Sequence, residues 1–425
     1  MKASESVKNY PSERRMYSNY VLRNIKKICK EIGPRCAGSE KEFEAQQWMA
    51  DELKNTCDDV KIEDFRLAPW AFMSWVQLTA CFCTVAALLL FATHFLPALA
   101  LPFTIAGTAL VVIAFFFVIT EFLLYKQALD PFMKKKTSHN VIAVRKASGE
   151  TKRRIIFTGH ADSAPEWRFT YWGGPKLVVP SIGLGLGGAA FTLVANVIGL
   201  VFVLKGTAVA DSKLIWILSI VNVCLIPVFL WCLLFYNKKR IVDGANDNLT
   251  GCLVSMAVPR FMQDHDIRFE NTEVMVICTG SEEAGLRGAK AFCKAHADEI
   301  KAEKDVETIC IALDTIRDYE FMGIYHKDMT GTVQNSKEVS ELVHKAGELC
   351  GLDIPYENLF FGSSDAAAMS QAGLKATCFA AMDPAPARYY HTRLDTADNL
   401  ELKTIEAGVD LVLNCAFLFD EEGLN

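Results

Sequence analysis

The chain has 425 residues, of which 51% are hydrophobic and 22% charged, and its formal net charge is -6. A pI near 5.8 and the lack of any basic motif exclude a nucleic-acid-binding surface of the usual kind. The mean hydropathy of +0.18 is high for a chain with this many charged residues, so apolar residues must be concentrated in a few segments.

The cysteines and the first residues bear on the cellular compartment. The fourteen cysteines form no CxxC pair, and four of them (Cys81, Cys83, Cys224 and Cys232) lie in strongly apolar stretches. This pattern favours free thiols in a reducing compartment. Residues 1–15 are polar and no apolar core follows them, so we expect no cleavable signal peptide.

Four apolar runs have about the length that crosses a hydrocarbon core. They form two pairs with short connections: 74–96 with 103–124, and 177–204 with 214–235. We therefore predict two transmembrane hairpins, 72–125 and 177–236. Glycines at 183, 185, 187 and 188 are more typical of close helix packing in lipid than of a nucleotide-binding loop, because the run around them is apolar.

The three polar segments, 1–71, 126–176 and 237–425, alternate predicted helices and strands. In chain order we expect a helix, a turn, a second helix and a strand within 17–67, strands at 140–144 and 154–158, a helix at 252–258, a strand at 274–278, a helix from 289, a strand at 309–313, a helix at 336–350, a strand at 377–381 and a helix at 402–419. This alternation predicts one α/β domain with a mixed sheet, interrupted by the hairpins.

Two adjacent acids, Glu282 and Glu283, follow the buried strand 274–278 and precede a helix. Adjacent side chains at a strand end point in different directions, so we expect the two acids to have different tasks. One can bind a metal while the other faces what the metal activates. The pattern by itself is equally typical of acidic residues at a helix N-terminus.

Five residues are candidate metal ligands: His160, Asp247, Glu283, Asp314 and His391. At least three of them follow predicted strand ends, where ligands collect in α/β sheets. Nitrogen and oxygen donors without thiolate suit zinc, with manganese or cobalt as substitutes. Asp162 can accept the other N–H of His160 and hold the ring. Each residue alone has an ordinary explanation as a core histidine or a helix cap, and the coincidence of five favours a site.

Five motifs in this order, GHADS, DGANDNLTG, GSEEAGLRGA, ALDT and YHTRLDT, resemble those of the di-zinc aminopeptidase and glutamate carboxypeptidase family, family twenty-eight of the metallopeptidases. The upstream GPRCAGSEKEFEAQQWMADEL is similar to that family's entry into its catalytic domain. The resemblance covers the chain outside the hairpins. It implies a mixed-sheet zinc-exopeptidase fold, which is phosphorylase/hydrolase-like.

The resemblance also implies a role for each ligand. His160 and Asp314 would hold one zinc, Glu283 and His391 the other, and Asp247 would bridge them. A metal-bridging hydroxide would attack the peptide, and Glu282 would be its general base. Asp162, by holding the His160 ring, is counted with Glu282 among the catalytic residues. The loop 361–365, which contains Asp365, is similar to a family loop near the substrate. Chemically, the tetrahedral oxyanion would rest on the second zinc, and a tyrosine such as Tyr389 or Tyr390 could donate a hydrogen bond to it.

Three functions compete on this evidence. The first is an aminopeptidase for short peptides, the second a glutaminyl-cyclase-like acyltransferase with one zinc, and the third a non-catalytic membrane scaffold of the same fold. The compact GSEEAGLRG loop and the complete ligand set favour the peptidase. Ala161 stands where many relatives have a larger residue, and the family does not ordinarily carry hairpins, so substrate choice stays open. The expected partners are a peptide substrate and a lipid bilayer.

Both hairpins return to the side they left, so the polar segments share one face of the membrane. The flanks on this face carry Lys126, Lys134, Lys135, Lys136, Lys176, Lys238, Lys239 and Arg240, and the opposite loops carry Lys205 and Lys213. The positive-inside bias predicts a plasma-membrane protein with its catalytic domain in the cytoplasm. The strands at 58–65 and 154–158 should be parallel, so that both hairpins leave from the ligand edge and the site opens towards the membrane, roofed partly by 126–137 and 165–176.

Overall fold

The computed structural model describes residues 2–424, and the chain divides into two compact units. We call residues Met1–Pro69, Lys134–Glu166 and Lys238–Asn425 the α/β unit, and Trp70–Met133 with Trp167–Asn237 the helical unit. Residues 126–133 and 167–176, which the sequence suggested as part of the α/β domain, cluster with the helices.

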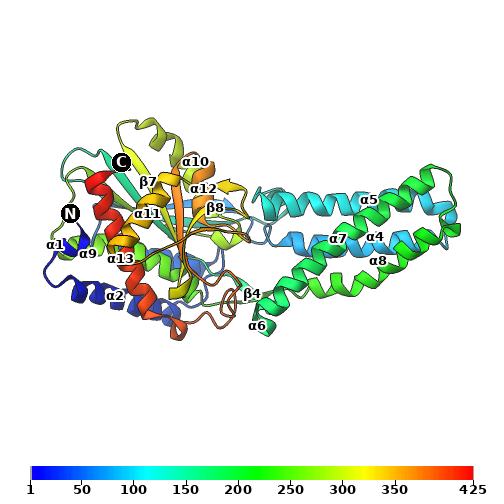
Figure 1. The fold of residues 1–425 in the computed structure, drawn as a ribbon, viewed down its shortest axis with the longest axis horizontal. Helices are drawn as coiled ribbons and strands as arrows, with labels where there is room; N and C mark the ends of the chain where they lie inside the picture. Colours follow the sequence, from blue (N-terminus) through cyan, green and yellow to red (C-terminus); the bar gives the residue numbers. More distant parts are fainter. Residues whose placement is uncertain (1, 425) are drawn as a thin grey trace. The chain divides into compact units, whose positions relative to one another are not determined.

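One mixed sheet organises the α/β unit, as the sequence predicted (Figure 1). Its nine strands lie in the order β1 (Asp59–Leu67), β2 (Lys136–Arg145), β6 (Thr272–Thr279), β3 (Arg153–His160), β7 (Glu307–Ile316), β11 (Lys375–Ala381), β8 (Met322–Asp328) and β10 (Tyr356–Asn358), with β9 (Val333–Gln334) paired to β8. The pairs β6–β3, β3–β7 and β7–β11 are parallel, and β1–β2, β2–β6 and β11–β8 are antiparallel.

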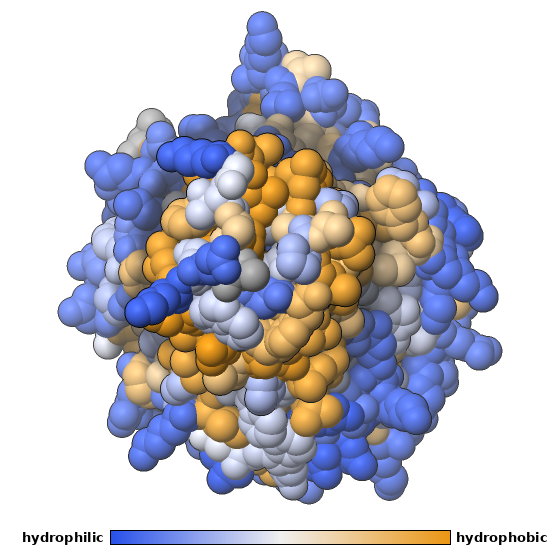
Figure 2. Space-filling model, turned by 90° about the vertical axis from the view of Figure 1, so that its right-hand side faces the viewer, coloured by the Kyte–Doolittle hydropathy of each residue, from blue (hydrophilic) through white to orange (hydrophobic). Residues whose placement is uncertain are grey.

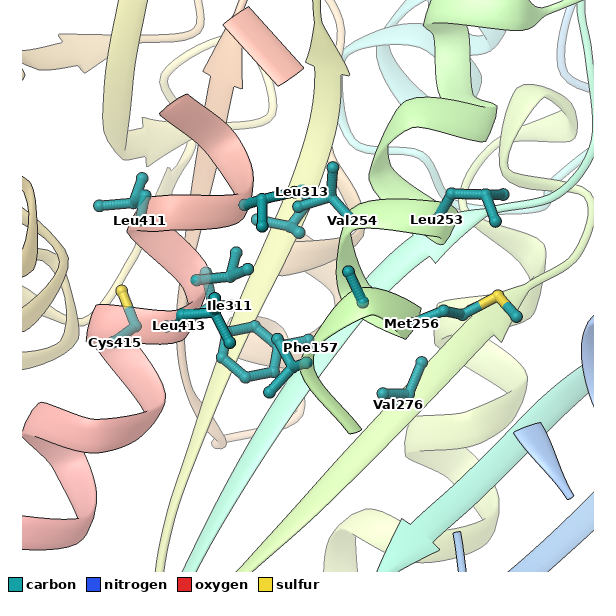
Figure 3. Close-up of a cluster of buried hydrophobic side chains, with 14 of the residues drawn as sticks. Phe157, Leu253, Val254, Met256, Val276, Ile311, Leu313, Leu411, Leu413 and Cys415 are labelled. Atoms are coloured by element: carbon teal, nitrogen blue, oxygen red, sulfur yellow. The ribbon is translucent and has the colours of Figure 1, made fainter. Parts of the chain in front are cut away.

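The central strands are buried on both faces, which explains their continuous apolar sequences. In β3, Ile155 and Phe157 join one core cluster and Ile156 joins the other, as the two-residue period of a strand requires. Figure 3 shows the first cluster, where Phe157 and Ile311 of the sheet meet residues of two helices.

Helices cover both faces of this sheet. The first cluster is covered by α2 (Tyr10–Glu31), α3 (Glu40–Leu53), α9 (Thr250–Asp264), α11 (Lys337–Leu349) and α13 (Leu402–Glu422), and the second by α10 (Arg287–Ala302) and α12 (Asp365–Gln371). A short helix, α1 (Ala3–Ser6), precedes α2. The sheet is therefore the middle of three layers in this unit.

Strand direction brings several carboxyl ends to one edge of the sheet. Because β1 and β6 both run antiparallel to β2, and β6 runs parallel to β3, the strands β1, β6, β3 and β7 all point the same way. The expected parallel direction of the first and third strands is thus confirmed, with β6 lying between β2 and β3. The chain leaves the α/β unit soon after the carboxyl ends of β1 and β3.

The helical unit contains four helices that are long and apolar enough to cross a membrane. They are α4 (Ser74–Ala92), α5 (Ala100–Phe117, continued by Val118–Leu123), α7 (Pro175–Leu204) and α8 (Lys213–Cys232). A short helix, α6 (Arg168–Gly173), leads into α7, and a small strand pair joins β4 (Pro165–Trp167) to β5 (Tyr236–Ile241). Figure 2 views the end of this unit, where hydrophobic side chains predominate.

The helix ends and contacts differ in detail from the apolar runs. The run 74–96 stops as a helix at Ala92, because Pro97 begins the next turn and disfavours a helical residue before it. Between α7 and α8, Thr192 Oγ1 donates to Asn222 Oδ1 at 2.8 Å. A Cβ on Gly188 would lie 3.2 Å from the Phe229 ring, so this glycine permits close helix packing, whereas Gly183 has no such neighbour.

Candidate metal centre

Three of the five predicted ligands come together at the sheet edge. His160 is the last residue of β3, Asp247 lies in the irregular segment Ala245–Leu249 before α9, and Glu283 lies in the 3-10 turn Glu282–Ala284 after β6. One ligand atom from each residue lies within 4.8 Å of the others. The neighbouring strands β3 and β6 thus bring His160 and Glu283 to their carboxyl ends, and the segment before α9 brings Asp247 to the same place.

His391 completes this cluster from the far end of the sequence. Its Nε2 lies 3.0 Å from Asp247 Oδ2 and 3.1 Å from Glu283 Oε1. On the other side of Asp247, Oδ1 lies 3.1 Å from His160 Nε2. One carboxylate therefore lies between two imidazoles with one oxygen facing each.

Asp314 lies inside β7 rather than after its end, two residues before Ile316. It is partly buried and accepts a hydrogen bond from Thr315 Oγ1 at 3.2 Å. Burial, together with the negative charge of Asp247, raises the pKa of Asp314 to about 7.

The cluster has the chemistry of a cation site. Asp247 Oδ2 and Glu283 Oε1 are buried and have no hydrogen bond of good geometry within residues 2–424. Burial raises the pKa of Glu283, although the charge of His391 opposes this. A divalent cation would neutralise these acids and occupy the unsatisfied oxygens, and imidazole and carboxylate donors without thiolate fit zinc.

Asp162 contacts both His160 and the turn that contains Glu282 and Glu283. Its Oδ1 lies 3.4 Å from His160 Nδ1 and accepts from Glu282 N at 2.9 Å, and its Oδ2 accepts from Glu283 N at 3.1 Å. Asp162 was predicted to orient the imidazole. The structure adds that the same carboxylate anchors the backbone of the turn with the two glutamates.

Glu282 and Glu283 face different imidazoles. Glu282 Oε2 lies 3.8 Å from His160 Nε2, whereas Glu283 contacts His391. Ser281, just before them, has a left-handed backbone with φ of 55°. Burial raises the pKa of Glu282 well above its usual value, opposed by His160. The different directions agree with different tasks for the two acids.

The two candidate tyrosines, Tyr389 and Tyr390, have different contacts. The Tyr390 ring stacks on His391 with 3.9 Å between centroids, and burial raises the pKa of its phenol. Tyr389 OH instead donates to Asp318 Oδ2 at 2.8 Å. Of the two, Tyr390 is therefore the one beside the ligands.

Asp365 begins α12 and is buried. It accepts from Thr279 Oγ1 at 2.5 Å, at the end of β6. Burial raises the pKa of Asp365 to about 6, against the effect of that hydrogen bond. Asp365 thus contacts β6, the strand that precedes Glu282 and Glu283.

Two further buried charges support the ligand loops and were missed by the sequence analysis. Arg35 is fully buried and donates to the carbonyl oxygens of Ala161 at 2.7 Å, Asp243 at 2.7 Å and Gly244 at 2.9 Å. It therefore ties the loop after His160 to the loop before Asp247. The only signal in the sequence was its place in the upstream GPR segment.

Glu42 is the second of these charges. It is fully buried on α3 and accepts from Ser281 N at 2.7 Å and from Ser281 Oγ at 2.9 Å. Burial raises the pKa of Glu42 to about 8. An acid in the first turn of an ordinary amphipathic helix gave no sign of this role, because its partners are mainly backbone and hydroxyl groups of distant loops.

Comparisons with known proteins agree with this geometry. Residues 234–416 match the model of Peptidase family M28. A zinc aminopeptidase from Bacillus subtilis has a similar structure, with a TM-score of 0.54 at 16% identity over 94% of both chains. A glutaminyl cyclase from Fimbriiglobus ruber has a TM-score of 0.54 at 12% identity over 94% of this chain and 95% of that one.

A third structure, the LapA aminopeptidase of Legionella pneumophila, has a TM-score of 0.51 at 11% identity over 97% of this chain and 76% of that one. At these identities the likeness establishes the fold alone, and the similarity to the family rests on the matched residues. These contain Asp247, Glu282, Glu283, Asp314 and His391. Residues 234–416 are thus similar to peptidase family M28, and the chain has the fold seen in zinc aminopeptidases and glutaminyl cyclases.

Proposed function

We propose that the protein is a membrane-anchored di-zinc exopeptidase, an aminopeptidase that hydrolyses short peptides. One observation carries the proposal: Asp247 lies between His160 and His391 with one oxygen facing each imidazole. Two cation positions on either side of one carboxylate are what a two-metal hydrolase requires.

The ligands divide between the two positions. His160 and Asp314 would hold one zinc, Glu283 and His391 the other, and Asp247 both. The bound ions would lower the pKa of a coordinated water and polarise the peptide carbonyl. Manganese or cobalt would be acceptable to the same donors.

Glu282 is the proposed proton carrier. It lies beside the cluster, 3.8 Å from His160, and burial gives its carboxylate a raised proton affinity. It takes one proton from the attacking water and delivers it to the leaving amine as the C–N bond breaks. Asp162 keeps Glu282 in place through the backbone, and the Tyr390 phenol is placed beside His391 to donate to the carbonyl oxygen.

The surplus of carboxylates supports an amino-terminal preference. Two zinc ions would bring four positive charges to the five carboxylates Glu282, Glu283, Asp247, Asp314 and Asp365, so the site would keep a negative charge that attracts the ammonium group of a free peptide N-terminus. Asp365, at the start of α12, is the proposed substrate-side acid.

A glutaminyl-cyclase-like reaction is the second candidate, favoured by the similarity to the Fimbriiglobus ruber enzyme. A cyclase would release ammonia from a glutaminyl peptide, whereas an aminopeptidase would release free glutamine. The complete set of five ligands favours the aminopeptidase. A non-catalytic scaffold of the same fold would carry out neither reaction.

The four apolar helices support a membrane anchor, and the lysines on their flanks support a cytoplasmic α/β unit at the plasma membrane. That the site opens towards the membrane stays a prediction. Support comes from the chain leaving the α/β unit soon after β1 and β3, whose carboxyl ends share the edge that carries His160.

The test is a substrate panel with the full-length protein in detergent or nanodiscs supplied with zinc. It compares dipeptides and aminoacyl amides with their N-acetylated forms and includes a glutaminyl peptide, with Glu282→Gln as the inactive control. We expect hydrolysis of the free amino forms only. Ammonia and a pyroglutamyl product would favour the cyclase, and no turnover of any substrate would favour the scaffold.

A further inference from the structure

A second acid, Asp395, follows His391 in the YHTRLDT motif and has no role in the mechanism above. Its side chain is fully buried. Its backbone N–H donates to Thr392 O at 2.9 Å, so a tight turn connects it to the segment that carries His391. A buried carboxylate needs partners, and those of Asp395 lie far away in the sequence.

Both carboxylate oxygens of Asp395 bind the segment that contains the proposed bridging ligand. Oδ1 accepts from Asn246 N and from Asn246 Nδ2, each at 2.8 Å, and Oδ2 accepts from Asp247 N at 3.2 Å. Three donors on two consecutive residues thus converge on one side chain.

The backbone around Asp247 explains why an acceptor is needed there. Asp247 has φ of -111° and ψ of 91°, and Asn248 has φ of -140° and ψ of 43°, so the segment is not helical despite its place before α9. In that conformation the N–H groups of Asn246 and Asp247 donate to Asp395 and not to a strand or to α9. A buried N–H without an acceptor costs about 1–3 kcal/mol, so the carboxylate favours this conformation over others.

A second aspartate in the site accepts two consecutive backbone N–H groups in the same way. Asp162 follows His160 and accepts from the N–H groups of Glu282 and Glu283. Each candidate histidine is therefore followed by a buried aspartate, Asp162 or Asp395, that accepts hydrogen bonds from the backbone of a different ligand-bearing loop. In both cases the two N–H groups lie on consecutive residues, one of which is a proposed ligand.

We infer that Asp395 is a positioning residue that fixes the backbone of Asn246–Asp247, and thereby keeps the Asp247 carboxylate aimed between His160 and His391. It does not touch metal or substrate. The inference rests on the proposed function for the identity of the metal. It predicts that a change at Asp395 weakens metal binding without removing a ligand.

The sharpest variant is Asp395→Asn. Its amide oxygen can keep both hydrogen bonds from Asn246, but its NH₂ group then faces Asp247 N, a donor against a donor. The matched control is Asp410→Asn, a buried acid on α13 that accepts from Tyr10 OH at 2.8 Å and contacts none of the ligand loops. A milder variant, Asn246→Ala, removes the one side-chain donor, Asn246 Nδ2, and keeps both backbone N–H groups.

The experiment measures zinc binding by metal-free full-length protein in detergent, in competition with a chromogenic chelator, and thermal unfolding of the same samples. For Asp395→Asn we expect at least one zinc to bind about tenfold to a hundredfold more weakly, with peptidase activity recovering as zinc is raised. Asn246→Ala should shift zinc binding in the same direction by less, and this readout remains if Asp395→Asn does not fold. Asp410→Asn should bind zinc as the wild type does.

Unchanged zinc affinity in both Asp395→Asn and Asn246→Ala would overturn the inference while leaving the proposed function intact. So would an equal loss of zinc affinity in Asp410→Asn, since that would indicate general destabilisation. If the wild type itself takes up no zinc, the proposed function fails, and the inference fails with it.

Discussion

Exchanging the two adjacent glutamates for neutral residues separates proton transfer from metal binding. In Glu282→Gln the backbone N–H that donates to Asp162 is unchanged, so the turn should keep its conformation. Glu283 still faces His391 at 3.1 Å, and the five ligands remain. The variant loses only the carboxylate that carries the proton.

General base catalysis contributes typically about 10²- to 10⁴-fold to the rate, which corresponds to about 3–5 kcal/mol of activation free energy. We therefore expect kcat of Glu282→Gln to fall by about that factor. Zinc content should stay at the wild-type value. Glu283→Ala, in contrast, removes a ligand oxygen and should lose zinc together with activity.

The assay is the initial rate of hydrolysis of an aminoacyl chromogenic substrate by full-length protein, with zinc measured by elemental analysis on the same preparation. A Glu282→Gln variant with more than about a tenth of the wild-type kcat would refute the assignment of the base. A loss of zinc in Glu282→Gln equal to that in Glu283→Ala would show that the two roles are shared or reversed.

Three further predictions concern proton linkage, sidedness and helix packing. Without metal, the pKa of Asp314 is about 7 and that of His391 about 10, where the charges of Glu283 and Asp247 outweigh burial, so the folded state binds protons more tightly than the unfolded chain. The stability of the metal-free protein should therefore fall as pH rises from about 5 to 8, and zinc should restore it. A metal-free protein whose Tm is higher at pH 8 than at pH 6 would contradict this. A reporter fused after the C-terminus should be active on the cytoplasmic side, and activity on the exoplasmic side alone would overturn the topology. Asn222→Leu should remove the hydrogen bond from Thr192 and destabilise the helical unit by about 0.6–1.7 kcal/mol in detergent unfolding. The control Ile220→Val, at a side chain that is 47% exposed, should have no measurable effect. Equal effects of the two variants would show that the hydrogen bond contributes nothing.

Much of the fold could be predicted because its central strands are buried on both faces. Runs such as residues 274–278 and 309–313 are continuously apolar, and they became β6 and β7. The strands on the far side of the sheet were not predicted. β8 contains Tyr325, His326 and Lys327 and lacks an apolar run, while β9 and β10 have only two and three residues and are defined by pairing alone.

The candidate ligands could be found for a related reason. Three of them, His160, Glu283 and Asp314, are metal-binding residue types at or near strand ends, and an α/β sheet gathers such positions at one edge. The residues that hold the ligand loops could not be found in this way. Arg35, Glu42 and Asp395 bind mainly backbone and hydroxyl groups of distant segments, and no spacing of side chains in the sequence encodes those contacts.

The central claim is that Asp247 joins two metal positions. The most direct measurement is the zinc stoichiometry of the full-length protein, titrated from the metal-free state and compared with Asp247→Asn and His391→Ala. We expect two zinc ions per chain in the wild type, and fewer than two in each variant. A wild type that binds one zinc or none, or a His391→Ala variant that still binds two with unchanged affinity, would contradict it.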